Sequence, residues 1–259
     1  MPKFFVKQEQ ILDKEIIVVG QDVSHIKNVL RMKEGDRVNV CNIDSKVNYV
    51  AEIMGISGEV RCKIIETINS EAEPDTHISL FQGLPKADKM ELIIEKCTEI
   101  GVSEFIPVEM KRCVVKLDEK NKQKKLERWQ KIAETAAKQS GRDYIPKIER
   151  IVGVKDICNV MQDYDIVLLA YEKEKTNTLK ENLASLNEER TPSHYVTAPL
   201  LKGPRIAIIV GPEGGLDKSE VEHFKEAGVK AISLGKRILR TETAGIVMAA
   251  NILYELENP

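Results

Sequence analysis

The stretch Arg205-Ile206-Ala207-Ile208-Ile209-Val210-Gly211-Pro212-Glu213-Gly214-Gly215 decides the fold of this chain. Its first six residues form a nearly continuous apolar run, which is typical of a central parallel strand covered on both faces. After the glycine loop, Asp217-Lys218-Ser219-Glu220 forms a capping box that predicts the start of a helix, which Gly228 would end. Such a loop lets the backbone approach a ligand closely, although a purely structural turn from strand to helix would use the same residues.

The chain repeats this arrangement at the next predicted strand, Ala231 to Leu234. That strand enters Gly235-Lys236-Arg237-Ile238-Leu239-Arg240, after which Thr241 or Thr243 can cap a final helix that runs through Leu256. The arginines and the helix N-terminus would suit an anion or an RNA phosphate, and the apolar pair between them would suit a flat ring. Neither loop matches the phosphate-binding pattern G-x-x-x-x-G-K-S/T, and G-x-G-x-x-G does not occur, so the standard nucleotide-triphosphate and dinucleotide sites lose support.

Strands and helices also alternate upstream of this stretch, which indicates an α/β fold with a parallel sheet. Apolar runs predict strands at Ile78 to Phe81, Phe105 to Val108 and Asp165 to Ala170. Helices are predicted from about Asp88 to Ile100 and from about Glu119 to Gln139. In the first of these helices, Leu92, Ile93, Cys97 and Ile100 are expected on the buried face. The polar region Asn187 to Gly203 predicts a flexible loop.

The first seventy residues follow a different pattern, with short β-like runs broken by turns. The runs are Ile16 to Val19, Arg37 to Cys41, Val47 to Ile53 and Val60 to Ile68. They predict a small β-barrel, interrupted by a helix over His25 to Met32 with Ser24 as its N-cap. The polar stretch Asn69 to Asp75 predicts a linker between this barrel and the α/β part.

Composition limits the classes of function. The chain has 259 residues with 42% hydrophobic and 31% charged residues, as expected of a globular protein. No apolar run approaches a bilayer span, and Met1 to Gln10 lack the features of a signal peptide, so we expect a cytoplasmic protein. The five cysteines include no C-x-x-C pair and the four histidines lack ligand spacing, so we expect neither disulfides nor a metal.

The formal net charge of −2 gives no support for nucleic-acid binding, which would need a local basic patch. One segment offers such a patch: Lys111, Arg112, Lys116, Lys120, Lys122, Lys124, Lys125, Arg128 and Lys131. A solvated helix face would have the same composition, so this segment alone does not decide between the two interpretations.

The two glycine loops together resemble those of the SPOUT class of methyltransferases, and within it the RsmE family. The resemblance rests on Gly211 to Gly215 and on Leu234 to Ala244. Further segments agree in order and spacing: His25 to Arg31, Gly83 to Lys86 with Lys89, Glu95 to Gly101, Glu134 to Arg142, and Leu169 to Glu172. Lys3 departs from the family pattern, in which an arginine precedes the two aromatic residues.

The resemblance implies a PUA-like, RNA-binding β-barrel over residues 1–71 and a SPOUT methyltransferase domain with a trefoil-knotted parallel sheet over residues 72–259. It also implies a homodimer that uses S-adenosyl-L-methionine to methylate N3 of a specific uridine in 16S ribosomal RNA of the small subunit. The residues expected to hold the cofactor are Leu169, Ala170, Tyr171, Val210, Gly211, Pro212, Glu213, Gly214, Gly215, Leu234, Gly235, Ile238, Leu239, Arg240, Thr241, Thr243 and Ala244.

For the transfer itself, we expect Arg240 to stabilise negative charge on the uracil, because it is a fixed cation beside a cofactor loop. Glu172, Glu213 and Glu242 are the candidate proton acceptors, and Glu242 in a first helical turn is also favoured by the helix dipole alone. The candidate RNA contacts are Lys3, His25, Lys27, Arg31, Lys86, Arg112 and Arg142, together with the basic segment from Arg112 to Lys125.

Three alternatives remain open at this stage. The first is a SPOUT methyltransferase that acts on transfer RNA or on a ribose hydroxyl, since the loops constrain the methyl donor more than the acceptor. The second is a non-catalytic RNA-binding or ribosome-assembly protein, which would not bind S-adenosyl-L-methionine tightly. The third is an enzyme that binds another adenine-containing ligand in the same crevice.

Overall fold

The structure is a computed structural model that describes residues 1–69, 72–188 and 203–257. Contacts between Cα atoms divide the chain into two compact units. Unit 1 contains Met1–Glu73 and Ala137–Tyr144, and unit 2 contains Pro74–Ala136 and Ile145–Pro259. Most of the predicted loop from Asn187 to Gly203 lies outside the described residues.

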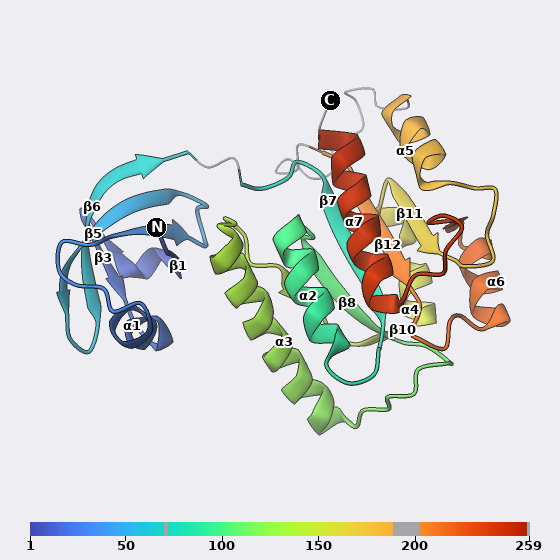
Figure 1. The fold of residues 1–259 in the computed structure, drawn as a ribbon, viewed down its shortest axis with the longest axis horizontal. Coiled ribbons are helices and arrows are strands. Elements are labelled where there is room, and N and C mark those ends of the chain that lie inside the picture. The colour runs from blue at the N-terminus through green and yellow to red at the C-terminus, as the bar shows by residue number, and fades with distance from the viewer. Residues whose placement is uncertain (70–71, 189–202, 258–259) are drawn as a thin grey trace. The chain divides into compact units, whose positions relative to one another are not determined.

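Unit 1 is built on a six-stranded sheet in the order β1-β4-β5-β6-β3-β2, which curls into a half-barrel (Figure 1). Its strands are β1 (Lys3–Val6), β2 (Ile11–Leu12), β3 (Glu15–Val18), β4 (Arg37–Asn42), β5 (Asn48–Ile56) and β6 (Val60–Ile68). The four predicted strands are confirmed as β3 to β6. Inward-facing side chains such as Phe4, Val40 and Ile53 fill the core because strand residues alternate between the two faces.

The helical insertion of unit 1 begins earlier than predicted. Helix α1 (Gln21–Ser24) follows Gly20, whose φ of 75° allows the sharp change of chain direction. Ser24 has helical dihedral angles, so its prediction as an N-cap is wrong. A π-helical turn, η2 (His25–Val29), continues the insertion, and a φ of 53° at Arg31 ends it.

Unit 1 also includes the chain segment from Ala137 to Tyr144. Lys3 pairs with Asp143 and donates a hydrogen bond to the Gly141 carbonyl at 3.0 Å. The Glu73 carboxylate accepts hydrogen bonds from Arg142 Nη2 at 2.7 Å and from the backbone N–H of Asp143 at 2.7 Å. The predicted domain boundary between residues 71 and 72 assigns Ala137–Tyr144 to the second domain, whereas the contacts place this segment in unit 1. Ion pairs between residues distant in sequence hold the segment there.

Unit 2 contains a parallel sheet in the order β10-β8-β7-β12-β11-β13, with β9 paired to β8. Its strands are β7 (His77–Gly83), β8 (Glu104–Glu109), β9 (Lys147–Ile148), β10 (Val152–Gly153), β11 (Ile166–Ala170), β12 (Arg205–Val210) and β13 (Lys230–Ile232). The predicted parallel strands are confirmed, and the sequence RIAIIV forms the strand β12 near the middle of the sheet.

Helices cover both faces of this sheet (Figure 1). On one face lie α2 (Lys89–Ile100), the unit 2 part of α3 (Glu119–Ser140), α5 (Leu179–Glu188) and α7 (Thr241–Glu257). On the other lie α4 (Val154–Asn159), the 3-10 turn η3 (Met161–Asp163) and α6 (Lys218–Glu226). In β12, Ile206 and Ile208 pack on the first face and Ala207 and Ile209 on the second, which explains its continuous apolar sequence.

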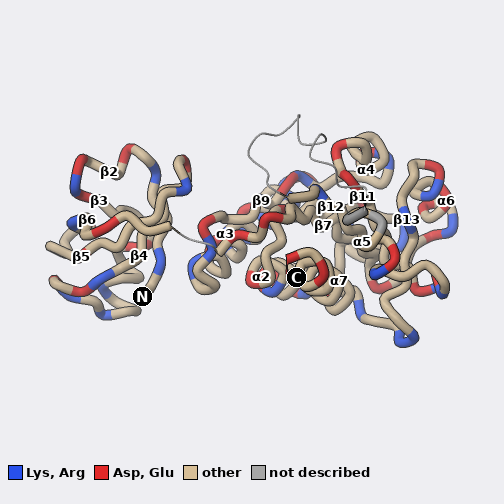
Figure 2. The backbone as a smooth tube through the Cα atoms, turned by 90° about the horizontal axis from the view of Figure 1, so that it is seen from above, with Lys and Arg blue, Asp and Glu red and all other residues tan. Residues whose placement is uncertain are grey.

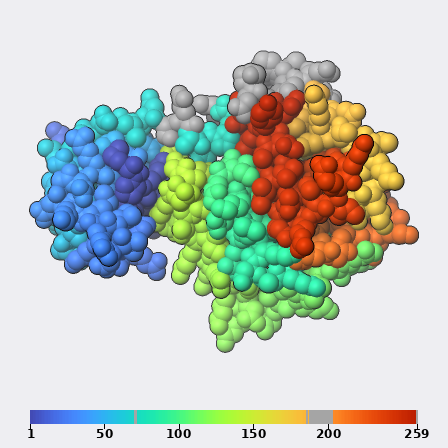
Figure 3. Space-filling model, in the orientation of Figure 1, coloured from blue at the N-terminus to red at the C-terminus, as the bar shows by residue number. Residues whose placement is uncertain are grey.

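Helices α2 and α7 pack against each other, and their side chains lie next to one another on the surface of unit 2 (Figures 1 and 3). Met90, Ile93, Ile94 and Cys97 form the buried face of α2. Leu92 is 43% exposed, so its prediction as a core residue is wrong. The three- and four-residue intervals join Ile93, Cys97 and Ile100, whereas Leu92 lies about 100° around the helix from Ile93 and therefore faces away from the core.

The ends of the central strands lie level with one another. Ala170 at the end of β11 pairs with Val210 at the end of β12 and with Ile232 at the end of β13. Val210 in turn pairs with Gln82 in β7. Because parallel strands place their carboxyl ends at one edge, the loops that follow these strands are brought together there.

Candidate functional site

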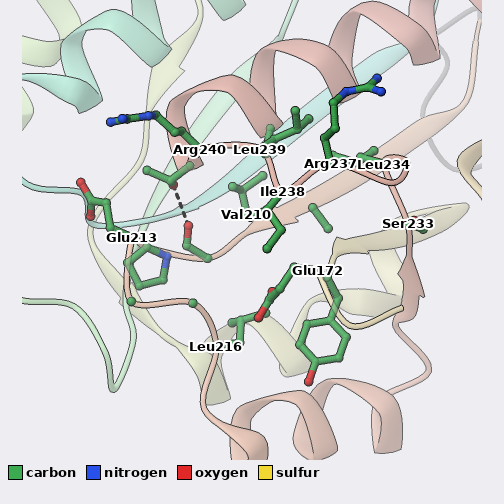
Figure 4. Close-up of a pocket in the computed structure, with 18 of the residues that line it drawn as sticks. Glu172, Val210, Glu213, Leu216, Ser233, Leu234, Arg237, Ile238, Leu239 and Arg240 are labelled. Carbon is green, nitrogen blue, oxygen red and sulfur yellow. Dashed lines mark hydrogen bonds between the residues drawn. The ribbon is translucent and has the colours of Figure 1, made fainter. Parts of the chain in front are cut away.

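A cavity of about 540 Å³ lies in unit 2 at the carboxyl ends of β11, β12 and β13 (Figure 4). It is formed by the loops that follow these strands. Its lining residues are Lys89, Ala170, Tyr171, Glu172, Val210, Gly211, Pro212, Glu213, Gly214, Gly215, Leu216, Ser233, Leu234, Gly235, Lys236, Arg237, Ile238, Leu239, Arg240, Thr241 and Ala244. The volume lies in the range of about 300–1,000 Å³ usual for small-molecule sites.

Close backbone approaches explain the glycines around the Gly211–Gly215 loop. A Cβ atom added at Gly83 would lie 2.7 Å from both the nitrogen and Cδ of Pro212, and one at Gly214 would lie 3.0 Å from the carbonyl oxygen of Arg112. Gly215 has a φ of 67°, which L-residues with side chains rarely adopt. The loop is therefore held tightly against the end of β7 and the segment after β8.

A hydrogen-bond relay joins this loop to helix α7. The Gln82 side-chain amide donates to Thr241 Oγ1 at 2.9 Å, and the Thr241 hydroxyl donates to the Gly211 carbonyl at 2.6 Å (Figure 4). Helix α7 begins at Thr241, and the backbone N–H of Thr243 already bonds to the Arg240 carbonyl. The prediction that Thr241 or Thr243 caps the helix is therefore wrong, because both lie within its first turn.

The loop after β11 supports the second glycine loop. The backbone N–H of Tyr171 donates to the Ile232 carbonyl at 3.1 Å, and that of Ser233 donates to the Asn177 carbonyl at 2.8 Å. Between these contacts, Glu174 accepts backbone hydrogen bonds from Thr176, Asn177 and Lys175, which lower its pKa to about 2. The chain from Tyr171 to Asn177 thus forms a hydrogen-bonded turn that fixes the start of the loop at Ser233.

The structure brings most of the predicted cofactor residues together around the cavity. Leu169 and Thr243 do not line it: the Leu169 side chain is buried in the core between the sheet and α6. Five lining residues were not predicted, namely Lys89, Leu216, Ser233, Lys236 and Arg237. Three of these belong to the second loop or its approach, so the loop sequence could have indicated them, whereas Lys89 comes from α2 and no local pattern places it here.

The candidate catalytic side chains differ in their surroundings. Glu172 and Arg240 are both exposed. Figure 4 shows Glu172 beside Leu216 at the cavity, whereas Arg240 extends toward the side on which Glu213 lies. A Cβ atom added at Gly215 would lie 3.5 Å from Glu172 Oε1, so the Glu172 carboxylate faces the first glycine loop.

Glu213 is held by cationic and backbone donors. Its carboxylate accepts hydrogen bonds from the Lys86 N–H at 3.0 and 3.3 Å and lies 3.1 Å from Lys89 Nζ. Partial burial acts to raise the pKa of Glu213, but hydrogen bonds from its own backbone N–H, from Lys86 and from Lys89 outweigh it and lower the pKa. A carboxylate that is already engaged in this way is a weak proton acceptor.

The predicted RNA contacts fall into different environments. Lys3 and Arg142 are only 8% and 3% exposed, and their charges pair with Asp143 and Glu73 inside unit 1. Burial and pairing therefore occupy the charges that the sequence predicts as RNA contacts at Lys3 and Arg142. The remaining candidates, His25, Lys27, Arg31, Lys86 and Arg112, are exposed.

The basic segment is partly neutralised within unit 2. Arg112 Nη1 donates to the Gly214 carbonyl at 3.3 Å, and its Nη2 lies 3.4 Å from Asp217 Oδ2. Lys122 pairs with Glu109 and Glu119, and Arg128 pairs with Glu91. Figure 2 shows acidic and basic residues interspersed along α3. Arg112 therefore supports the first glycine loop, in addition to any contact with a ligand.

Within residues 1–69, 72–188 and 203–257, no group of three or more His, Cys, Asp or Glu side chains could hold a metal ion. All five cysteines are free thiols. No helix in the described part of the chain is long and apolar enough to cross a membrane.

The chain thus combines a parallel α/β unit that carries a glycine-loop cavity with a curled β unit, and two family models place this combination among the RNA methyltransferases. A family model described as "RNA methyltransferase domain" matches residues 72–253, and one described as "RNA methyltransferase PUA domain" matches residues 20–65. The chain is 38% identical to ribosomal RNA small subunit methyltransferase E of Bacillus subtilis, over 99% of this chain and 98% of that relative. The chain belongs to the ribosomal RNA small subunit methyltransferase E family, which confirms the resemblance found in its loops.

Other relatives agree with this assignment. The enzyme of the same name from Mesomycoplasma hyopneumoniae is 32% identical over 98% of this chain and 100% of its own length. The structure of a ribosomal RNA small subunit methyltransferase E from Neisseria gonorrhoeae bound to S-adenosyl methionine has a TM-score of 0.81. It is 27% identical and covers 97% of this chain and 96% of that one.

Proposed function

We propose that this protein transfers a methyl group from S-adenosyl-L-methionine to N3 of a uridine in 16S ribosomal RNA of the small ribosomal subunit. The observation that supports it most strongly is the cavity at the level ends of β11, β12 and β13 in a chain of this family. The named function of the Bacillus subtilis relative supplies the class of substrate. Ribosomal RNA as substrate is consistent with action in the cytoplasm.

The cavity has the chemistry that S-adenosyl-L-methionine requires. Its walls combine exposed backbone at Gly211, Gly214 and Gly235 with apolar side chains at Leu216 and Ile238, which suit the polar edge and flat faces of an adenine. Two related structures, from Neisseria gonorrhoeae and Legionella pneumophila, contain this cofactor by name. When bound, the cofactor supplies an electrophilic methyl group on a sulfonium centre.

The residues of the chain must then position the uridine and manage its N3 proton. Alignment of the attacking nitrogen with the methyl carbon is the larger demand, because a displacement needs the two atoms in line. A base within folded RNA must also leave its stack before its Watson–Crick edge can enter a cavity. The exposed His25, Lys27 and Arg31 of unit 1 are the proposed RNA contacts that hold the substrate.

We propose that Glu172 accepts the proton from uridine N3 and that Arg240 stabilises the negative charge that this leaves on the uracil. Glu172 faces the cavity in Figure 4, and Glu213 is a poorer acceptor because its carboxylate is already engaged and its pKa is lowered. A guanidinium remains charged at all working pH values, so Arg240 can stabilise an anionic uracil without taking part in proton transfer.

The proposal extends to the knot and to the dimer that the family resemblance implies. The loops after β11, β12 and β13 would form the trefoil knot, and α7 would contribute to the contact between subunits. Ile238, shortly before α7, is 82% exposed, and Tyr254, near the end of α7, is 69% exposed. Large apolar and aromatic side chains with this exposure support burial of α7 against a partner subunit.

The test is transfer of labelled methyl from S-adenosyl-L-methionine to small ribosomal subunits purified from a strain that lacks this protein, followed by nucleoside analysis. Appearance of N3-methyluridine supports the proposal. Cofactor binding without incorporation would redirect the search to transfer RNA or to ribose methylation. Absence of both binding and incorporation would favour a non-catalytic RNA-binding protein, and preference for a nucleotide over S-adenosylhomocysteine would favour another adenine-containing ligand.

A further inference from the structure

Lys89, in the first turn of α2, reaches the cavity from outside its three loops. Its ammonium nitrogen lies 3.1 Å from Glu213 Oε1 in the first glycine loop and 3.2 Å from Glu242 Oε2 in the first turn of α7. Glu242 directly follows the second glycine loop and Thr241. One cation therefore contacts a carboxylate from each of the two segments that form most of the cavity wall.

We propose that Lys89 is a positioning residue that fixes the two cofactor-binding loops relative to each other by pairing with Glu213 and Glu242 at once. The inference rests on the proposed function, since it takes S-adenosyl-L-methionine as the ligand of these loops. It adds to that function a residue that is distant from both glycine loops in the sequence but contacts a carboxylate from each of the two segments.

The corner between β7 and α2 is shaped to present Lys89 in this way. Ala87 has a φ of 54°, a left-handed conformation that a residue with a side chain rarely adopts. This turn directs the Lys86 N–H and the Lys89 ammonium to the same carboxylate of Glu213. Backbone strain retained at a site needs support from the surrounding structure, and it is most often found where positioning matters.

Both carboxylates depend on this cation. Glu242 Oε2 is buried and has no hydrogen-bond partner of good geometry among the described residues, so the nearby ammonium provides its compensation. The contacts of Lys89 with the Glu213 carboxylate, and then with the Glu242 carboxylate, raise the pKa of the ammonium group, so it remains charged. Without the cation, two carboxylates would face each other across a partly buried space, and their repulsion would separate the loops.

Neighbouring contacts show that the same corner supports both loops by other means. Gly83 approaches Pro212 so closely that a Cβ atom would not fit, and Gln82 holds Thr241, which in turn holds Gly211. The ionic contact of Lys89 differs from these in one respect: it can be removed and restored by changing charge alone.

The experiment compares three variants of the full-length protein: Lys89→Met, Lys89→Arg, and a double variant that carries both Lys89→Met and Glu242→Gln. Lys96→Met is the matched control, because Lys96 lies on the same helix and pairs with Glu95 and Glu99 outside the cavity lining. Two readouts are used: the dissociation constant of S-adenosylhomocysteine by calorimetry, and amide hydrogen exchange of residues 211–215 and 241–244 without ligand.

The expected result for Lys89→Met is faster exchange in both segments and affinity weakened about tenfold, the loss of roughly one charge-assisted contact pair. Lys89→Arg and Lys96→Met should behave like the wild type. The double variant should recover part of the affinity, because removing one carboxylate relieves the repulsion, which a purely steric role of Lys89 would not allow.

Unchanged exchange in Lys89→Met, or no recovery in the double variant, would overturn the inference. A wild type that binds no S-adenosylhomocysteine, but whose loops exchange faster after Lys89→Met, would retain the role of Lys89 and reject the proposed cofactor. The two failures are therefore distinguishable.

Discussion

The close approach of Gly83 to Pro212 gives a sharp prediction for Gly83→Ala. The added Cβ would lie 2.7 Å from the Pro212 nitrogen and Cδ and 3.0 Å from Met110 Sδ. Carbon atoms in favourable contact lie about 3.5–4.0 Å apart, so the first glycine loop must move by roughly 1 Å. Gly83 is not among the residues with positive φ, so alanine is strained there by contact and not by its own backbone.

The cost of such overpacking is about 1–3 kcal/mol. At about 2 kcal/mol, the melting temperature should fall by about 4–8 °C, since each kcal/mol shifts a unit of this size by about 2–4 °C. The displaced loop should also weaken binding of S-adenosylhomocysteine. The measurements are a thermal melt and calorimetric titration of the same sample.

Gly245→Ala is the matched control. Gly245 lies within α7, and a Cβ atom there would make ordinary contacts of 3.4 Å with Leu80 and 3.7 Å with Gln82. Alanine is favoured over glycine within a helix by about 1 kcal/mol, so this variant should melt at or above the wild-type temperature. Equal melting temperatures and affinities for Gly83→Ala and the wild type would refute the steric account of the loop.

Three further predictions concern charge. Arg240→Ala should lower kcat by about 10²–10³ in single-turnover methylation at saturating S-adenosyl-L-methionine, with Glu172→Gln measured alongside it as a companion variant. Near-normal turnover would remove Arg240 from the mechanism. For Glu174, backbone hydrogen bonds from Thr176 and its neighbours hold the pKa in the folded state near 2, below the unfolded-state pKa of about 4.3. The stability that the Glu174 carboxylate contributes is therefore fully present above about pH 4.3 and is lost as the pH falls toward 2. Melts between about pH 5 and pH 3 should therefore show a shallower acid decline for Glu174→Gln than for the wild type, and parallel curves would contradict this. Lys3→Met should destabilise unit 1 by about 3 kcal/mol, because the buried Asp143 carboxylate loses its partner, and chemical denaturation that shows no change would contradict the structural role.

The sequence identified the elements of unit 2 well because its signals are local. The apolar run of β12, the Asp217–Glu220 capping box and the strands β3 to β6 of unit 1 follow from side-chain periodicity and turn residues, and the structure confirms them. The two glycine loops likewise marked the edge of the sheet at which the cavity lies. The family was evident from these loops for the same reason, since each loop is a short run of consecutive residues.

Positions that depend on neighbours distant in sequence were predicted poorly. Ser24 and Thr241 have the side chains of helix caps, but Gly20 sets the start of α1, and Thr241 is used to hold Gly211. Leu92 is apolar but lies beside the stripe of Ile93 and Cys97 that packs in the core, and it is exposed.

Charged residues show the limit most clearly. Lys3, Arg142 and Lys89 look alike in the sequence as cations available to RNA or solvent. Tertiary structure alone decides that Lys3 and Arg142 are buried with Asp143 and Glu73, and that Lys89 reaches Glu213 and Glu242. The sequence by itself therefore determined the main strands and the long helices, the family and the edge of the sheet that forms the site. Only the folded chain determined the partner of each charge, because an ion pair depends on distances of a few ångströms between segments that the sequence separates by tens of residues.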